Sequence, residues 1–197
     1  MKMSGSQIIQ APRQVVWKGL NNPKVLQQCI PGCETIHATS PTEMNAKVAL
    51  KVGPVKALFK GAVTLSDIVP PESYRISGQG QGGLAGFASG GATVKLAANG
   101  STETLMEYDV DAQIGGKLAM LGSRLIDTTA RSLAEQFFSK FSAMMKQAHS
   151  SASAIRTKLA KKTKATPTRK KLAAKKPVRS RAVATKTKKK AIKSRSR

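Results

Sequence analysis

The chain has 197 residues and a formal net charge of +24, from 34 Lys and Arg residues against 10 Asp and Glu. Residues 151–197 contain 19 of the basic residues and no acid, so residues 1–150 carry a net charge of only +5. A body of about 150 residues buries roughly 70% of its unfolded surface, which is enough for an independent core. The sequence therefore predicts one folded domain, 1–150, and a basic tail, 151–197, that is disordered because it buries too little apolar surface.

Membrane spans, disulfide frameworks and metal sites are all disfavoured by the sequence. It has no run of about 18 apolar residues and no apolar stretch typical of a signal peptide, so we expect a cytoplasmic protein. Two cysteines, Cys29 and Cys33, are too few for a disulfide framework. With only His37 and His149 beside them, they also lack the ligands for a closed zinc site, and we interpret them as buried free thiols.

The first thirty residues predict one strand and two short helices. Lys2–Gln10 is predicted as the strand. Pro12 fits the first turn of a helix that continues to Leu20, because proline has no N–H to lose there. A second helix is expected from Pro23 to Cys29, where Ile30-Pro31-Gly32 stops it.

Between Glu34 and Ile114 the apolar residues recur with a period of two, which predicts antiparallel strands that bury one face. Asn99-Gly100 is a strong hairpin signal between the last two of them. Gly53-Pro54 marks another turn. The predicted strands in this region are Met44–Val52, Val55–Leu65, Glu72–Gly80, Ala92–Leu96 and Met106–Ile114.

The last part of the body predicts one long amphipathic helix over Gly116–Lys146. Apolar residues at three- and four-residue steps form a single stripe along it. The residues of this stripe are Leu118, Leu121, Leu125, Thr129, Leu133, Phe137 and Phe141. The order of the elements therefore predicts an α+β fold in which a curved antiparallel sheet holds one long helix.

The strip 78–91 is rich in glycine where two strands should meet. Missing side chains leave space above the helix, so we hypothesise a pocket with Leu84–Phe87 as a mobile gate. The alternative is a flexible hairpin over a filled core. The candidate ligand-binding residues are Val48, Leu50, Phe59, Val63, Phe87, Tyr108, Leu121 and Leu125. The glycines at 78, 80 and 83 match G-x-G-x-x-G, but no helix follows them, so a dinucleotide site is not expected.

An ordered set of short motifs covers residues 3 to about 141. They are Ala11-Pro-Arg, Val16-Trp17, Asn22-Pro23, Cys29-Ile-Pro-Gly-Cys-Glu34, Lys51-Val-Gly-Pro-Val-Lys56, Phe59-Lys-Gly61, Gly86-Phe87, Tyr108-Asp-Val-Asp-Ala112, Gly115-Gly-Lys-Leu-Ala119 and Leu121-Gly-Ser-Arg-Leu125. With this set the chain resembles the CoxG family of carbon monoxide dehydrogenase subunits, part of the START-like, helix-grip (SRPBCC) superfamily.

The resemblance implies a hydrophobic cavity between sheet and helix that accepts an apolar ligand. It also implies an accessory role for molybdenum hydroxylases of the carbon monoxide dehydrogenase type, either recruiting the enzyme to the membrane or linking it to the quinone pool. Members often carry an apolar C-terminal anchor, whereas this chain has the basic tail at that place.

Catalytic motifs are missing from the sequence, and the acids Glu107, Asp109 and Asp111 share the outward face of one predicted strand. We therefore expect no enzyme activity, no catalytic residues, no metal and no covalent cofactor. The expected function is binding of an apolar ligand such as a quinone, with the tail docked on the anionic inner face of the membrane. Two alternatives stay open: a nucleic-acid-associated protein that acts through its tail, and a START-like lipid carrier unrelated to carbon monoxide oxidation.

Overall fold

The structure is a computed structural model that describes the backbone of residues 1–163 and the side chains of residues 1–151. Its last element, helix α3, spans Ser123–Thr163, so the first residues of the predicted tail, 151–163, belong to this helix. The rest of the predicted tail, residues 164–197, lies outside the described residues. The boundary at residue 150 between domain and tail stays a prediction.

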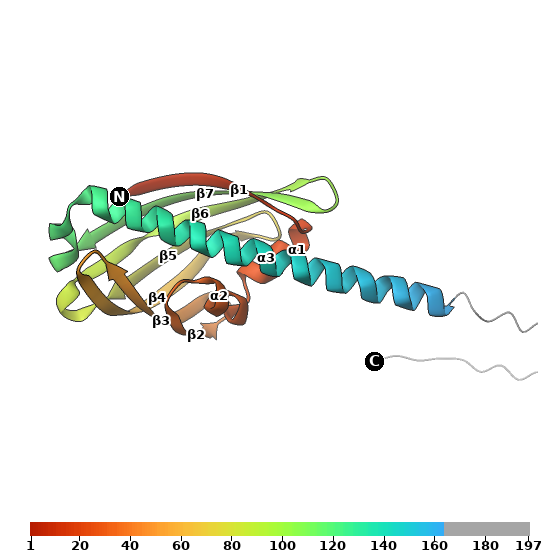
Figure 1. Cartoon of the computed structure of the whole chain (residues 1–197), viewed down its shortest axis with the longest axis horizontal. Coiled ribbons are helices and arrows are strands. Elements are labelled where there is room, and N and C mark those ends of the chain that lie inside the picture. The colour runs from red at the N-terminus through yellow and green to blue at the C-terminus, as the bar shows by residue number, and fades with distance from the viewer. Residues whose placement is uncertain (164–197) are drawn as a thin grey trace, which may run out of the picture.

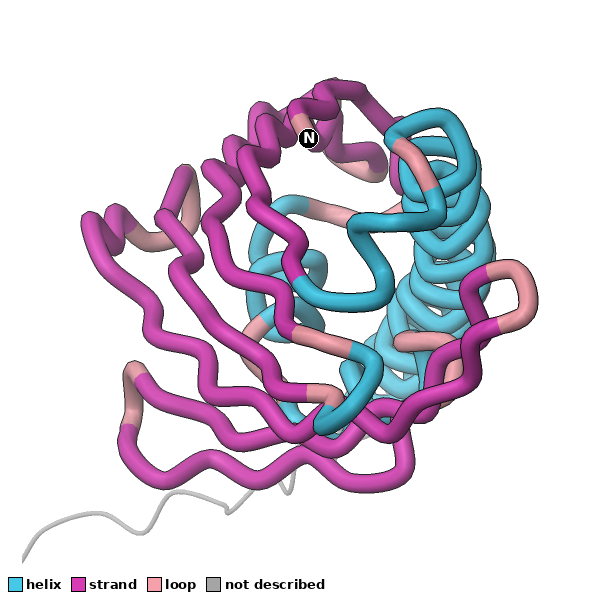
Figure 2. Tube along the Cα trace, turned by 90° about the vertical axis from the view of Figure 1, so that its left-hand side faces the viewer, coloured by secondary structure: helices cyan, strands magenta, loops and turns pink. Residues whose placement is uncertain are grey.

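Seven strands form one antiparallel sheet in the order β1-β7-β6-β5-β4-β3-β2. The sheet curls around α3, which lies in its concave face (Figures 1 and 2). This is the predicted α+β architecture. The strands are β1 (Lys2–Ile9), β2 (Cys33–Ser40), β3 (Glu43–Val52), β4 (Val55–Val69), β5 (Ser73–Gln81), β6 (Phe87–Asn99) and β7 (Glu103–Gly115).

Two short helices, α1 (Arg13–Leu20) and α2 (Pro23–Cys29), carry the chain from β1 at one edge of the sheet to β2 at the other. The second helix begins as the sequence predicts, with Pro23 in its first turn. The side chain of Asn22 caps it by accepting a hydrogen bond from the Lys24 N–H at 3.0 Å. These helices cover the end of the concave face that α3 crosses last (Figure 1).

At that end the interior is a filled core. Phe141 and Met145 of α3 are buried and pack against α1. A Cβ atom at Gly19 would lie only 2.5 Å from the Met145 sulfur, so the absence of a side chain on α1 lets the two helices approach closely. Phe137 and Phe141 stack at 5.6 Å between ring centroids and continue this core along α3.

At the opposite end two 3-10 turns, η1 (Gly83–Ala85) and η2 (Gly116–Leu121), lie against each other. We call η1 and η2 together the cap. Their approach depends on glycine, because a Cβ atom at Gly86 would collide with the carbonyl oxygen of Gly115. Gly86 also has φ of +115°, a conformation that L side chains rarely adopt.

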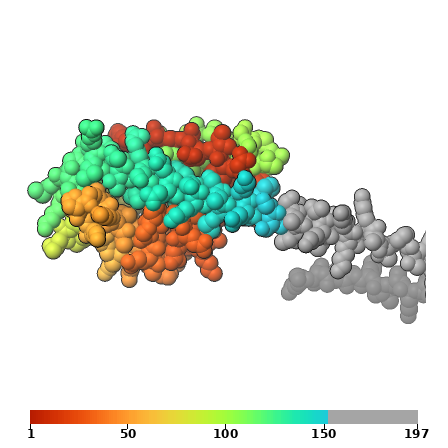
Figure 3. Space-filling view, viewed as in Figure 1, coloured from red at the N-terminus to blue at the C-terminus, as the bar shows by residue number. Residues whose placement is uncertain are grey.

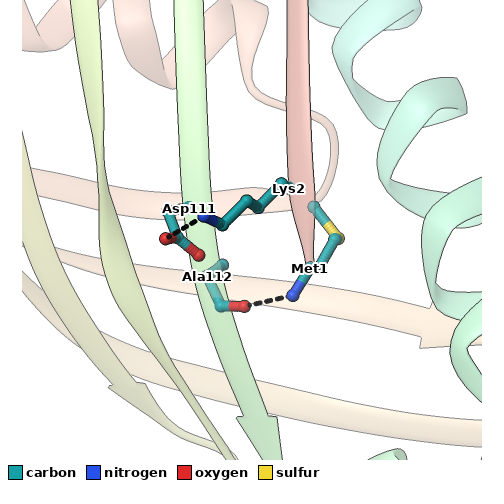
Figure 4. A network of polar contacts seen from close by, with 4 residues as sticks. All are labelled: Met1, Lys2, Asp111 and Ala112. Carbon is teal, nitrogen blue, oxygen red and sulfur yellow. Dashed lines mark hydrogen bonds and ion pairs between the residues drawn. The ribbon is translucent and has the colours of Figure 1, made fainter.

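The N-terminal strand is tied to β7 at the same end (Figure 4). The N-terminal amine of Met1 donates a hydrogen bond to the carbonyl oxygen of Ala112 at 2.7 Å. Lys2 forms an ion pair with Asp111, with 3.7 Å between Nζ and Oδ2. Both partners of the pair are largely exposed to solvent, so its contribution to stability is small.

The bounds of several elements differ from the sequence predictions, and α3 ends at Thr163, well beyond the predicted Lys146. The long helix begins at Ser123 and not at Gly116, because Gly122 has φ of +82° and separates η2 from α3. Strand β6 begins at Phe87, well before the predicted Ala92. Strand β2 was not singled out from the sequence, since its alternation is short and polar on one side.

Candidate functional site

An apolar cavity of about 740 Å³ lies between the sheet and α3. It occupies the middle of the concave face. The filled core near α1 lies on one side of it, and on the other side Phe59 of β4 forms a smaller cluster with Ala85 and Leu118 of the cap. Every strand of the sheet contributes to the wall, and α3 closes the open side. Its main apolar wall residues are Met3, Val48, Leu50, Val63, Ile76, Ala92, Val110, Ile114, Ile126, Leu133, Phe137 and Phe138.

The period of two in the strands explains why these walls are apolar. In β7 the residues Met106, Tyr108 and Val110 face the cavity, while Glu107 and Asp109 between them are exposed. The same alternation holds in β3 and β4. As a result the cavity wall contains no carboxylate, amine, imidazole or thiol side chain among the residues that the structure describes.

The titratable side chains of the cavity wall belong to two tyrosines, Tyr74 and Tyr108. Tyr74 is buried, with its ring at 5.4 Å from Trp17 in an edge-to-face arrangement, and burial raises its pKa. Tyr108 is half-buried and its ring lies 5.0 Å from the Phe138 ring. Its hydroxyl reaches across β1 at Gly5, where a Cβ atom would collide with it. A phenol can donate one hydrogen bond and accept others, so these hydroxyls could orient a carbonyl group of a bound ligand.

The glycine-rich strip widens the cavity. Gly78 and Gly80 of β5 and Gly90 of β6 lie in its wall and bring no side chain to it. At Gly80 the nearest atoms to an added Cβ are 3.9 Å away, which leaves room for a side chain on the cavity side. That the missing side chains of the strip make a ligand pocket stays a prediction.

Five of the eight candidate residues lie together in the cavity wall. They are Val48, Leu50, Phe59, Val63 and Tyr108, which come from β3, β4 and β7. The cross-strand pairing of Val48 with Phe59 places two of them side by side. Whether they bind a ligand stays a prediction.

The other three candidates lie outside the wall. Phe87 is 42% exposed, because Ala88 and Ala92 face the cavity and strand alternation turns residue 87 to the outer surface, over Gly115. Leu121 packs in the cluster under the cap. Leu125 is 36% exposed and its side chain lies against Gly53.

The displacement of Leu121 and Leu125 has two causes. Leu121 lies in η2, before α3 begins at Ser123. Leu125 lies in α3, but repeated steps of four residues drift around a helix of 3.6 residues per turn, which places it about 120° from Phe137. Counting back from Phe137 along α3 instead selects Leu133, Ala130 and Ile126, which do line the cavity. Of these, Ala130 and Ile126 were missed although the helical period could have found them.

The predicted gate, Leu84–Phe87, is a hydrogen-bonded turn in this structure. The Gly82 N–H donates to the Gly86 carbonyl oxygen at 2.8 Å, and Ala85 is buried under the turn. Leu84 points away from the cavity and is 86% exposed. The wall at this end is formed by Phe59 and Leu118, so mobility of the turn stays a hypothesis.

The thiols lie outside the cavity wall. Cys29 is buried and its Sγ atom lies 3.4 Å from the Met144 sulfur, whereas Cys33 is half-buried at the start of β2. Burial raises the pKa of both thiols, which lowers their reactivity. Within the described residues no group of three or more His, Cys, Asp or Glu side chains could hold a metal ion.

Among the helices that the structure describes, none combines the length and the apolar character needed to cross a bilayer.

The fold is shared with solved structures. A conserved protein from Geobacillus kaustophilus is 27% identical with a TM-score of 0.71, over 76% of this chain and 97% of that one. A START superfamily protein from Mycobacterium smegmatis is 12% identical with a TM-score of 0.58, over 74% and 97%. The Zhui aromatase/cyclase from Streptomyces sp. R1128 is 10% identical with a TM-score of 0.54, over 75% and 94%. These likenesses establish a START-like fold.

Among curated proteins, none is significantly similar to this chain. The CoxG family of carbon monoxide dehydrogenase subunits matches residues 5–146, which cover the sheet, the cap and the cavity-lining part of α3. The short motifs between Ala11 and Leu125 fall within this match. The chain therefore belongs to the CoxG family of carbon monoxide dehydrogenase subunits.

Proposed function

We propose that this protein is a non-catalytic accessory protein that binds a quinone in the cavity between sheet and α3. In this proposal it links a molybdenum hydroxylase of the carbon monoxide dehydrogenase type to the membrane, where it works at the inner face. The observation that carries the proposal is the apolar cavity of about 740 Å³ in a chain of the CoxG family. Cavities of this size hold ligands of several hundred daltons.

The chemistry of the wall fits a quinone. Apolar side chains would cover the ring and the first part of an isoprenoid chain, whose transfer out of water is favourable. The ring carbonyls need hydrogen-bond donors, and the hydroxyls of Tyr74 and Tyr108 are available in the wall. A phospholipid would instead need a place for its charged headgroup. Among the described residues the wall has no cationic side chain, and the N-terminal amine of Met1 in the wall already donates to the Ala112 carbonyl oxygen.

The same wall supports binding and not catalysis. One structural neighbour is named as an aromatase/cyclase, so the fold can carry an enzyme. In this chain the titratable side chains of the wall are tyrosines, and burial raises the pKa of Tyr74 and keeps it protonated. General acid and base groups poised near neutral pH would need a carboxylate or imidazole there.

Membrane contact is proposed from charge. Residues 151–197 carry 19 basic residues, and each contributes about 1 kcal/mol near an anionic bilayer. Nucleic acid would attract the same residues without reading the base sequence. The family match concerns the body and favours the membrane-linked role.

The test is mass spectrometry of organic extracts from the gently purified full chain, compared with the variant Gly80→Leu. The leucine side chain would project into the cavity, because only ordinary contacts surround a Cβ at this position. We expect a quinone in stoichiometric amount with the unmodified chain and about tenfold less with the variant, a loss of ~1.4 kcal/mol in affinity.

The variant retains the basic tail, so lipid that adheres to the tail appears equally in both extracts. A thermal unfolding curve near that of the unmodified chain shows that Gly80→Leu still folds. Equal amounts of quinone in both extracts would contradict binding in the cavity. A phospholipid in place of a quinone would support the lipid-carrier alternative.

A further inference from the structure

The cap carries the most exposed apolar side chains of the body. Leu84 in η1 is 86% exposed and Met120 in η2 is 85% exposed. Phe87 and Leu125 beside them are 42% and 36% exposed. Large apolar side chains at such exposure on neighbouring turns are typical of a surface that contacts a partner or a membrane.

These residues lie at one end of the molecule because of the antiparallel topology. The β3–β4 turn, η1, η2 and the first turn of α3 are all at that end, and Leu125 touches Gly53 of the β3–β4 turn. Figure 3 shows the corresponding orange, yellow-green and green segments meeting at the left-hand end of the molecule. Leu84 and Met120 thus protrude from the same end as the β3–β4 hairpin tip.

Basic residues surround this apolar group. Lys51 and Lys56 are direct cross-strand partners at the β3–β4 turn, Lys117 lies in η2 and Arg124 in the first turn of α3, and all four are exposed. Like charges placed opposite each other weaken a strand pair, so the Lys51 and Lys56 pair needs a compensating partner. None of the four forms an ion pair with a described acidic residue.

The other end of the body carries charges of both signs. Glu43, Asp67, Glu72 and Glu103 lie there, at or next to the outer ends of β3, β4, β5 and β7. Two of them pair with arginines, Glu72 with Arg13 at 3.3 Å and Asp67 with Arg75 at 3.9 Å. The cap therefore has four exposed basic residues without an ion pair to a described acid, whereas at the opposite end acidic and basic residues pair with one another.

We propose that the cap is a membrane-docking surface that inserts Leu84 and Met120 into the interface of an anionic bilayer. Protruding apolar tips reach the boundary between headgroups and acyl chains, and lysine and arginine beside them pair with anionic headgroups while their alkyl stems stay in the apolar layer. Docking in this orientation sets the end of the cavity walled by Phe59 and Leu118 against the bilayer. The inference rests on the proposed function, since it sets the cap side of the cavity next to the membrane that would supply the ligand.

The test uses tryptophan as a depth probe in the full chain. Met120→Trp places the probe on the cap, and Val69→Trp places it on an exposed apolar position, 51% exposed, at the opposite end. Vesicles contain phosphatidylglycerol and a phosphatidylcholine with brominated acyl chains, which quench tryptophan only by close contact. Difference spectra against the unmodified chain remove the signal of Trp17.

With the vesicles, we expect the tryptophan emission of Met120→Trp to shift to shorter wavelength and to lose about half or more of its intensity. The tryptophan emission of Val69→Trp should stay unchanged. Leu84→Asp should weaken vesicle binding about tenfold, and Ile68→Asp at the opposite end should leave it within about twofold. The double variant Lys51→Gln and Lys56→Gln should weaken binding more than Lys18→Gln with Lys24→Gln.

The outcomes separate the two proposals. Sedimentation with the vesicles without quenching of Met120→Trp overturns cap docking and leaves a tethered protein whose cap is free for a protein partner. A chain that does not sediment with the vesicles overturns cap docking and the membrane role together. The extraction experiment on Gly80→Leu still decides ligand binding in that case.

Discussion

At the scale of single residues, one buried hydroxyl connects α1 to the sheet. Thr104 of β7 is fully buried and its hydroxyl donates a hydrogen bond to the Ala11 carbonyl oxygen at 2.7 Å. Ala11 is also fully buried, just before the first helical turn, so its carbonyl oxygen has lost contact with water. This bond fixes the place where the chain leaves β1 and enters α1, the first of the two helices that connect β1 to β2.

Replacing Thr104 with Val should lower the free energy of unfolding by about 1–3 kcal/mol, because the shape is kept but the buried Ala11 carbonyl loses its donor. Urea denaturation measures the change. Thr104→Ser is the matched control: it keeps the hydroxyl and loses one methyl group, which costs about 0.8 kcal/mol. A Val variant as stable as the unmodified chain would show that the hydrogen bond contributes nothing.

Tyr74 predicts a stability change at alkaline pH. Burial raises its pKa in the folded state, whereas in the unfolded chain it ionises near pH 10. Above about pH 10 the unfolded state therefore binds fewer protons than the folded state, and stability falls by about 1.4 kcal/mol per pH unit. Tyr74→Phe should lose this dependence.

The measurement is urea unfolding of both proteins between about pH 9 and 11. Lysines titrate in the same range in both proteins, so only the difference between the two curves reports Tyr74. If the difference in the free energy of unfolding between the two proteins stays constant with pH, burial does not raise the pKa of Tyr74.

At the scale of elements, the cap depends on one close approach of two backbones. Gly86 ends η1 at a positive φ and meets the backbone of Gly115 and Gly116 where η2 begins. The two turns are separated by β6 and β7 in sequence, yet they form one surface because these strands pair along their whole length, from Phe87 opposite Gly115 to the hairpin at Asn99. The cap is thus a consequence of strand pairing.

Gly86→Ala should destabilise the protein by about 2 kcal/mol or more, since it combines an unfavourable φ with a backbone collision. Gly83→Ala on the same turn is the control. It also has a positive φ, +59°, but no atom within 4 Å of an added Cβ, so it should cost only about 1 kcal/mol. Chemical denaturation of both variants measures these losses in the free energy of unfolding. Equal losses would mean that η1 and η2 can separate without a cost in stability.

At the scale of the whole molecule, packing and charge both change along the long axis. One end is a filled core around Phe141 and Met145, and the middle holds the cavity. The other end is the cap, with exposed Leu84 and Met120 among basic residues. The middle of the molecule can contain a cavity because the core at one end and the pairing of the strands stabilise the fold.

Much of this structure was predictable from the sequence. The alternating apolar residues of β3, β4 and β7 define which side chains face inward, and five of eight candidate residues lie in the cavity wall for that reason. The glycine-rich strip indicated free space. Local periodicity gives such results because one buried face imposes the same pattern on every residue of a strand.

Other features were decided only by the tertiary structure. The packing of α3 against the sheet decides which side of the helix faces inward, so that Ile126 lines the cavity and Leu125 stays at the surface. Phe87 faces outward because β6 begins earlier than its apolar residues suggest. The cap combines side chains from segments distant in sequence, and no local pattern encodes their meeting. Sequence alone thus determined which face of each strand is apolar, whereas the curvature of the sheet around α3 decided that this face encloses a cavity.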